Sequence, residues 1–141
     1  MAPPPAPAAP TLDMSLLEEE PATLGMVPIP GAPGAYMIGL TGEDRHARAV
    51  EMLEPGAPIW LQLEPDNPDD SSAIAAVDRY GRVIGYVAPD SWLREAVYGG
   101  GASFAAQVLA AETGSRGYRE VVLMVEPSEE ALTERRYQPP R

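Results

Sequence analysis

One polar segment between two apolar runs constrains this chain most. Residues 63–74 read LEPDNPDDSSAI, with two prolines and four Asp/Asn residues between the hydrophobic ends. In the preceding run, Ile59, Leu61 and Leu63 alternate with polar or amphipathic residues, the pattern of a β-strand with one buried face. Trp60, Gln62 and Glu64 then lie on the other face. Because Pro, Asp and Asn favour turns, the segment predicts a sharp turn that presents carboxylates and amides at one end of a sheet.

Six segments have the apolar content of β-strands, and two have the spacing and end signals of helices. The expected strands are 35–40, 59–64, 73–78, 83–87, 102–112 and 118–126, and the expected helices are 43–53 and 91–98. Asp90 is the expected N-cap of the second helix. A third short helix is expected at 128–136. This order predicts a mainly β (α+β) fold with two short helices, in which a small six-stranded, partly open barrel removes sheet edges.

Composition divides the chain into three parts. Residues 1–34 are rich in Pro and Ala, which predicts an extended arm without a core of its own. Within this arm, Leu12, Leu16 and Leu17 lie on one side of a short amphipathic turn and are its candidates for contact with a partner protein. Residues 35–126 form the expected domain, and residues 127–141 form a C-terminal tail.

Several classes of site and location are excluded or disfavoured. The chain has no cysteine, which excludes disulfides, thiolate nucleophiles and Cys-ligated zinc. His46 is the only histidine, so we expect a solvated side chain, no zinc site and no Ser/His/Asp catalysis, and we expect no cofactor. No run of 18 apolar residues predicts a membrane helix, and no basic segment followed by an apolar core predicts a signal peptide. We therefore expect a cytoplasmic or virion protein with no membrane partner.

The formal net charge is −11, and all ten basic residues are arginines. An acidic surface repels the phosphate backbone, and non-specific affinity for nucleic acid comes mainly from neutralising phosphates. Any nucleic-acid role would therefore need a local basic pocket.

The polar turn itself has three interpretations that the residues leave open. Asp66, Asn67, Asp69 and Asp70 are suited to hydrogen-bonding their own backbone, to lining a pocket for a polar terminus, or to holding a hard cation. Tyr86 is either structural or part of such a pocket. The two tryptophans, Trp60 and Trp92, are expected to pack rather than to offer stacking surfaces.

Four pieces of the sequence together resemble the HIRAN domain, over about residues 36–126. They are MIGL at 37–40, the helix before Pro55–Gly56, EPDNPDD at 64–70 with AI at 73–74, and GRVIGYV at 81–87. The third piece is similar to the family signature EPxNPxDxxAI, which specifies seven positions over eleven residues. The resemblance implies a six-stranded OB-like barrel with two helices that binds without catalysis. Members of the family are attached to fork-remodelling and repair ATPases and hold the 3′ end of single-stranded DNA. No phosphate-binding G-x-x-x-x-G-K-[ST] motif occurs here.

The resemblance also implies site residues. The family's pocket Asp corresponds to Asp70, whose carboxylate would accept a hydrogen bond from a terminal 3′-hydroxyl, with Asn67 beside it. Its two aromatic positions correspond to Tyr86 and Tyr118, where base stacking would contribute about 1–3 kcal/mol per ring. Arg45, at the start of the first helix, is the candidate for contact with a phosphate.

The sequence departs from the family at two places in this pocket. Asp69 occupies a position where an aromatic residue is common, and Thr41–Gly42 replace a basic and aromatic pair. Losing one stacking ring and one phosphate contact would weaken DNA binding by roughly 2–5 kcal/mol.

Two functions therefore remain for a chain that we expect to be a binding module and no enzyme. The preferred one is a docking or structural component of a larger assembly, such as a phage particle, with the N-terminal arm contacting a neighbouring protein subunit. The alternative is recognition of single-stranded DNA 3′ ends as a repair or replication accessory.

Overall fold

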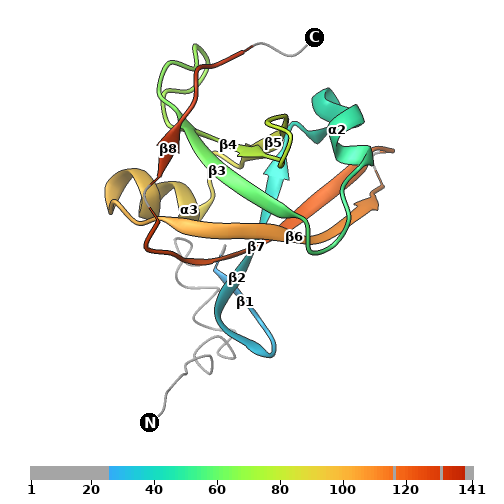
Figure 1. The fold of residues 1–141 in the computed structure, drawn as a ribbon, viewed down its shortest axis with the longest axis horizontal. Coiled ribbons are helices and arrows are strands. Elements are labelled where there is room, and N and C mark those ends of the chain that lie inside the picture. Colours follow the sequence, from blue (N-terminus) through green and yellow to red (C-terminus); the bar gives the residue numbers. More distant parts are fainter. Residues whose placement is uncertain (1–25, 116, 131, 139–141) are drawn as a thin grey trace.

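Six antiparallel strands form a closed ring in the computed structural model, which describes residues 26–115, 117–130 and 132–138. The pairing runs β2–β5–β4–β3–β6–β7 and returns to β2 through a β2–β7 ladder (Figure 1). The prediction of a mainly β fold with a small six-stranded barrel and two short helices is confirmed. The bounds are β2 Ala32–Thr41, β3 Pro58–Glu64, β4 Ala73–Val77, β5 Val83–Val87, β6 Phe104–Thr113 and β7 Arg119–Pro127.

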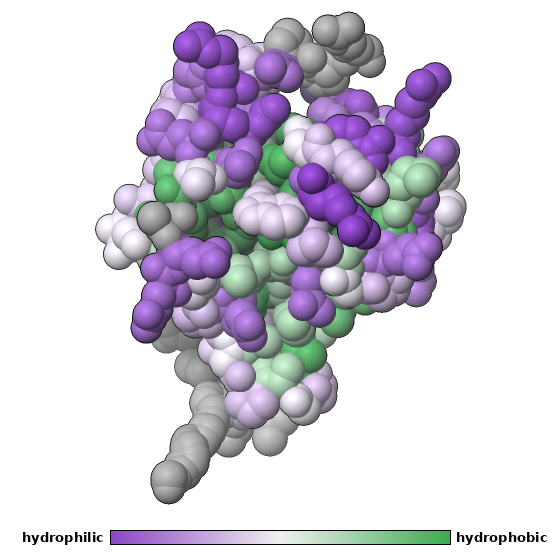
Figure 2. All heavy atoms as spheres, in the orientation of Figure 1, coloured by the Kyte–Doolittle hydropathy of each residue, from purple (hydrophilic) through white to green (hydrophobic). Residues whose placement is uncertain are grey.

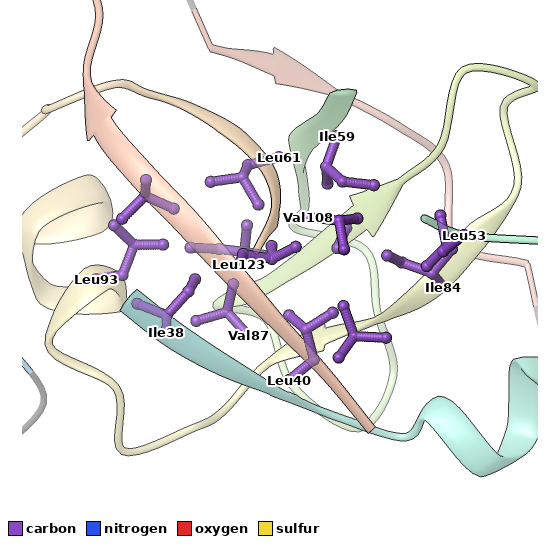
Figure 3. Close-up of a cluster of buried hydrophobic side chains, with 14 of the residues drawn as sticks. Ile38, Leu40, Leu53, Ile59, Leu61, Ile84, Val87, Leu93, Val108 and Leu123 are labelled. Carbon is purple, nitrogen blue, oxygen red and sulfur yellow. The ribbon is translucent and has the colours of Figure 1, made fainter. Parts of the chain in front are cut away.

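The core lies inside this ring and follows the period-2 alternation of the strands. Ile59 and Leu61 of β3 are buried, whereas Trp60 between them is 46% exposed. The inward residues from all six strands and both helices meet in one cluster (Figure 3). Burying each such aliphatic side chain contributes about 1.5–3 kcal/mol, so this cluster is the main stabilising element. The fully buried large apolar side chains are Ile74, Ile84, Leu93, Leu123, Val50, Val108, Val121 and Val125.

Both predicted helices are present; the first ends two residues early, and the second is shifted by one residue toward the C-terminus. The 3-10 turn Glu43–His46 leads into α2 (Ala47–Glu51), and α3 (Trp92–Arg94) continues as a π-helical turn Glu95–Gly99. The two lie at opposite sides of the ring (Figure 1). The cap of α3 is Ser91 and not Asp90, because the helix begins one residue later, at Trp92. The Ser91 hydroxyl accepts a hydrogen bond from the Leu93 backbone amide at 3.2 Å.

The N-terminal boundary of the folded part differs from the expected one. Residues 26–34 were assigned to the arm, yet β1 (Val27–Ile29) pairs antiparallel with β2 through a turn at Gly31, whose φ is +81°. The prolines that suggested a linker are compatible with this strand because β1 lies at an edge. The remainder of the predicted arm, including Leu12, Leu16 and Leu17, lies outside the described residues.

The C-terminal helix expected at 128–136 is wrong. Residues Thr133–Glu134 instead form β8, a short strand that pairs in parallel with β3. The Arg135 backbone amide donates to the Leu63 carbonyl at 2.9 Å and extends this pairing. The tail therefore lies beside the last residues of β3 and continues the sheet at that edge.

The tryptophans take the expected packing role in one case only. Trp92 meets the rings of Tyr36 and Phe104 edge-on, with centroid separations of 5.5 and 5.6 Å.

In the view of Figure 2, hydrophilic residues gather over the upper part of the molecule, and the projecting β1–β2 hairpin below is paler and more apolar. Within the described residues, no helix is long and apolar enough to cross a membrane.

Candidate functional site

The turn after β3 is built by hydrogen bonds to its own backbone. The Asn67 side-chain oxygen accepts from the Asp69 amide at 2.9 Å, and the Asp70 carboxylate accepts from the Ser72 amide at 3.0 Å. Three backbone turns follow one another, closed by the amides of Asn67, Asp70 and Ala73. The interpretation of this segment as Asx turn chemistry is confirmed. These bonds fix the direction in which its remaining polar atoms point.

Glu64 is the centre of a buried polar network at the end of β3. Its side chain is fully buried. One carboxylate oxygen accepts hydrogen bonds from the Tyr86 hydroxyl at 2.9 Å and from the side-chain NH₂ of Asn67 at 3.0 Å. The other oxygen forms an ion pair with Arg135. A buried carboxylate is tolerated only when it is paired and hydrogen-bonded, and Glu64 meets both conditions.

This network sets the state of Tyr86. Burial raises the pKa of the Tyr86 phenol, and the hydrogen bond to Glu64 raises it further, because ionisation would place a second negative charge beside the carboxylate. Tyr86 is therefore a neutral hydrogen-bond donor whose ring is held in one orientation.

Asp70 is held by a second ion pair. Its carboxylate meets the guanidinium of Arg94 from α3. Arg94 also donates to the carbonyls of Ser72 at 3.0 Å and Pro89 at 3.3 Å, so it ties the turn to the segment before the helix. An ionised carboxylate has about four lone-pair sites. Asp70 therefore keeps acceptor capacity beyond its bonds to Arg94 and Ser72, and its side chain is 36% exposed.

A pocket of about 390 Å³ lies between this turn, the end of β2 and β5. We call it the end pocket. It brings together four of the five candidate residues, Asn67, Asp70, Tyr86 and Arg45, from three separate parts of the chain. The rest of its lining is Thr41, Gly42, Asp44, His46, Asp69, Ala73, Val87, Pro89 and Tyr137.

The fifth candidate, Tyr118, does not line the end pocket. It belongs to the turn between β6 and β7, where its carbonyl accepts from the Gly114 amide at 3.0 Å. The next residue, Arg119, donates to the carbonyls of Val50 and Glu51 at 2.8 and 3.1 Å. These bonds hold the long β6–β7 hairpin beside α2, away from the polar turn.

Two pocket residues were missed by sequence reasoning. Tyr137 reaches the pocket because β8 lies along β3, and its backbone amide donates to the Asp66 carboxylate at 3.1 Å. No signal in the sequence indicates this position, because β8 has only two residues and is too short to show a periodicity. His46, expected to be solvated, is partly buried and lies with its ring tilted against Tyr86 at 6.3 Å between centroids. Burial lowers the pKa of His46, and repulsion from Arg135 and Arg45 lowers it further.

The electrostatics of the end pocket are acidic. Asp44, Asp69 and Asp70 line it against one arginine, Arg45, and His46 is held toward its neutral form. With Arg94, which pairs with Asp70 from outside the lining, three carboxylates face two guanidinium groups, and one net negative charge remains. Among the described residues, no group of three or more His, Asp or Glu side chains is arranged to hold a metal ion. The pocket therefore offers two tyrosine rings, hydrogen-bond acceptors and a single cation, a set suited to binding a polar organic group.

Comparison with known proteins agrees with this architecture. The structure is similar to the crystal structure of the HIRAN domain of human HLTF, with a TM-score of 0.52 and 20% identity, covering 67% of this chain and 74% of that one. A protein from Lactobacillus plantarum shows a TM-score of 0.48 and 19% identity, covering 64% of this chain and 91% of that one. No curated protein matches the sequence. The family model for the HIRAN domain matches residues 35–126, well over half of the chain. The chain therefore belongs to the HIRAN domain family.

Proposed function

We propose that the end pocket binds the 3′-terminal nucleotides of single-stranded DNA, and that the protein acts by binding alone, without catalysis, as a repair or replication accessory. The observation that carries this proposal is the convergence of Asp70, Asn67, Tyr86 and Arg45 in one pocket. Membership of the HIRAN family supports it, because the family resemblance implies the same ligand.

Each part of the pocket has a role in this proposal. The 3′-hydroxyl donates a hydrogen bond to Asp70, whose side chain is already held in place by Arg94. Terminal bases stack on Tyr86 and Tyr137, which contributes about 1–3 kcal/mol per base. The hydrogen bond from Tyr86 to Glu64 fixes that ring before the ligand arrives, so little conformational freedom is lost on binding.

The acidic lining predicts discrimination between two kinds of strand end. A 3′-hydroxyl is uncharged, whereas a 3′-phosphate would place negative charge beside Asp44, Asp69 and Asp70. Two unit charges about 4 Å apart near a protein surface repel by up to about 4 kcal/mol. After allowance for solvent screening, we expect the phosphorylated end to bind at least about tenfold more weakly, which corresponds to about 1.4 kcal/mol.

Fluorescence anisotropy with a labelled oligothymidylate tests the proposal. The free 3′-hydroxyl strand should bind more tightly than the same strand with a 3′-phosphate. Asp70→Asn should reduce affinity for the hydroxyl end by roughly 10- to 100-fold, as expected for loss of a charged acceptor, and should reduce the discrimination. Glu126→Gln is the matched control, since it removes one exposed carboxylate from the far end of β7.

Two results would overturn the proposal: equal binding of the two strand ends, or an Asp70→Asn variant that binds like the control. A melting curve for each variant shows whether the loss of the Arg94 ion pair has unfolded the domain. Asp70→Glu provides a second variant in which the charge is kept and only its position changes.

A second proposal concerns docking in a larger assembly, in the cytoplasm or in a virion. An apolar hollow of about 730 Å³ is lined by Tyr36, Trp92 and Phe104, together with Met26, the first described residue. The indole N–H of Trp92 is buried and has no hydrogen-bond partner in the described part of the chain. We propose that the N-terminal arm of a neighbouring copy occupies the hollow and supplies an acceptor for this N–H.

Light scattering on the full chain and on a variant lacking residues 1–25 tests the docking proposal. The full chain should form oligomers that the shortened chain does not form, and Trp92 fluorescence should change with protein concentration only in the full chain. A monomeric full chain at high concentration would exclude this mode of assembly. The end pocket and the hollow share Pro89 in their linings, so the DNA-binding test is carried out on the shortened chain as well as on the full chain.

A further inference from the structure

A second hollow adjoins the end pocket. It has a volume of about 650 Å³ and is lined by residues 44–49, by 81–83 at the β4–β5 turn, and by Arg135 and Gln138 of the tail. We call it the arginine groove. Asp44, Arg45 and His46 line both cavities, so the two cavities lie on either side of this segment or along it, within a few residues of each other.

The arginine groove is basic in an acidic protein. Four of the ten arginines line it: Arg45, Arg48, Arg82 and Arg135. Four guanidinium groups against Asp44 and the two partner carboxylates, Asp78 and Glu64, leave one net positive charge. The whole chain carries −11. The groove is therefore a local exception to the charge of the protein.

The arginines differ in how they are held. Arg45 and Arg48 are exposed and form no ion pair with any other described residue. Arg82 is positioned by its Nε, which donates to Asp78 at 3.0 Å, and by the Tyr80 ring, whose centroid is 5.2 Å from the guanidinium carbon. Its terminal nitrogens have no other partner within the described residues. Three arginines thus have donors available to an incoming anion.

The charges of the two cavities complement the charges along a single DNA strand near its 3′ end. The terminal 3′-hydroxyl is neutral, and the end pocket that would receive it is acidic. Every linkage upstream of the terminus carries one phosphate charge, and the cavity that continues upstream is basic. Arg45 lies at the junction, where the phosphate nearest the terminus would be placed.

We propose that the arginine groove binds the backbone phosphates upstream of the 3′-terminal nucleotides. The DNA strand then runs from the end pocket past Arg45 and Arg48 toward the β4–β5 turn at Arg82. This inference rests on the proposed function of the end pocket and adds to it a direction and a longer footprint on the DNA strand.

Strand length and salt dependence test the groove. Two probes are compared: thymidine dinucleotide and thymidine decanucleotide, both with a free 3′-hydroxyl. The decanucleotide should bind at least about tenfold more tightly at low salt. For single strands, the logarithm of the binding constant falls with the logarithm of salt concentration by about 0.7 per neutralised phosphate. Arg48→Ala should therefore flatten the decanucleotide slope by about 0.7 and affect the dinucleotide less.

Arg136→Ala is the matched control. Arg136 lies in the C-terminal tail, between Arg135 and Tyr137, and lines neither cavity. The substitution Arg136→Ala removes the same charge as Arg48→Ala and should leave the salt slope nearly unchanged. Arg48→Lys keeps the charge and should restore most of the salt dependence.

The outcomes separate this inference from the proposed function. A dinucleotide that does not bind overturns the proposed function, and the groove inference falls with it. A dinucleotide that binds as tightly as the decanucleotide overturns the groove inference alone. The same conclusion follows if Arg48→Ala and Arg136→Ala change the salt slope equally, because the effect would then come from net charge and not from the groove.

Discussion

The carboxylate of Glu64 supports both the fold and the end pocket, so its removal is the most informative perturbation. Glu64→Gln keeps the shape of the side chain and removes its charge. The amide oxygen can still accept the hydrogen bonds from Tyr86 and Asn67, which share one oxygen of the carboxylate. The amide cannot pair with Arg135, whose side chain is only 15% exposed, and its NH₂ group would face that guanidinium.

The size of the effect follows from these contacts. Removing one partner of a buried ion pair costs about 3–5 kcal/mol, because the other charge is left without compensation. Arg135 retains some access to water, so we expect the lower end of this range, about 3 kcal/mol. That is a large part of the 5–15 kcal/mol by which a domain of this size is stable. The melting temperature should fall by roughly 12–24 °C.

Urea unfolding of a set of variants tests this reasoning. Tyr86→Phe removes one hydrogen bond to the carboxylate and should cost about 1.5 kcal/mol, clearly less than Glu64→Gln. Replacing both partners, as in Glu64→Gln with Arg135→Met, should recover part of the loss, since no unpaired charge remains. A Glu64→Gln variant within about 0.5 kcal/mol of the unaltered protein would refute the structural role of the ion pair. So would strict additivity of the two substitutions in the double variant.

Three further predictions concern pH and the barrel. The pKa of His46 is lowered in the folded state, so its contribution to stability is present above pH 6.5 and is lost as the pH falls through the pKa of the folded state. His46→Gln should flatten this part of the profile of stability against pH, measured by urea unfolding. Asp78 is buried and accepts two backbone amides and the Arg82 Nε, so Asp78→Ala should cost about 3 kcal/mol in the same assay. Gly85→Ala would place a Cβ 3.0 Å from the Thr41 carbonyl oxygen at the β2–β5 junction, and calorimetry should show a loss of about 1–3 kcal/mol.

The barrel could be predicted from the sequence because its strands carry their own signals. The segment 83–87 coincides with β5 to the residue, and the turn before it contains Gly81 at a φ of +80°, as a hairpin connection requires. The polar turn after β3 was also predictable, since Asn and Asp side chains bond to backbone within two residues of themselves. Such local interactions are recorded in short stretches of sequence.

The two added strands could not be predicted in this way. β8 has two residues, too few to show any periodicity, and its position depends on Arg135 meeting Glu64, 71 residues earlier. The alternation of β3 placed Glu64 on the outer, polar face, and that placement is correct for the strand alone. The side chain is nevertheless fully buried, and its carboxylate is surrounded by Arg135 of the tail, Tyr86 and Asn67. The same pairing of the tail with β3 brings Tyr137 into the pocket, so the error in the fold and the omission in the site have one cause.

The acidic character of the chain has a specific consequence under the proposed function. A pocket with Asp44, Asp69 and Asp70 in its lining disfavours any ligand that carries a phosphate at that point. An internal segment of a strand has a phosphate there, and a 3′-hydroxyl terminus does not. Specificity is a difference in affinity between two ligands, and repulsion of the wrong ligand contributes to it as well as attraction of the right one. The carboxylate at Asp69 therefore removes a stacking surface and, in the same position, strengthens selection for the end of a strand over its interior.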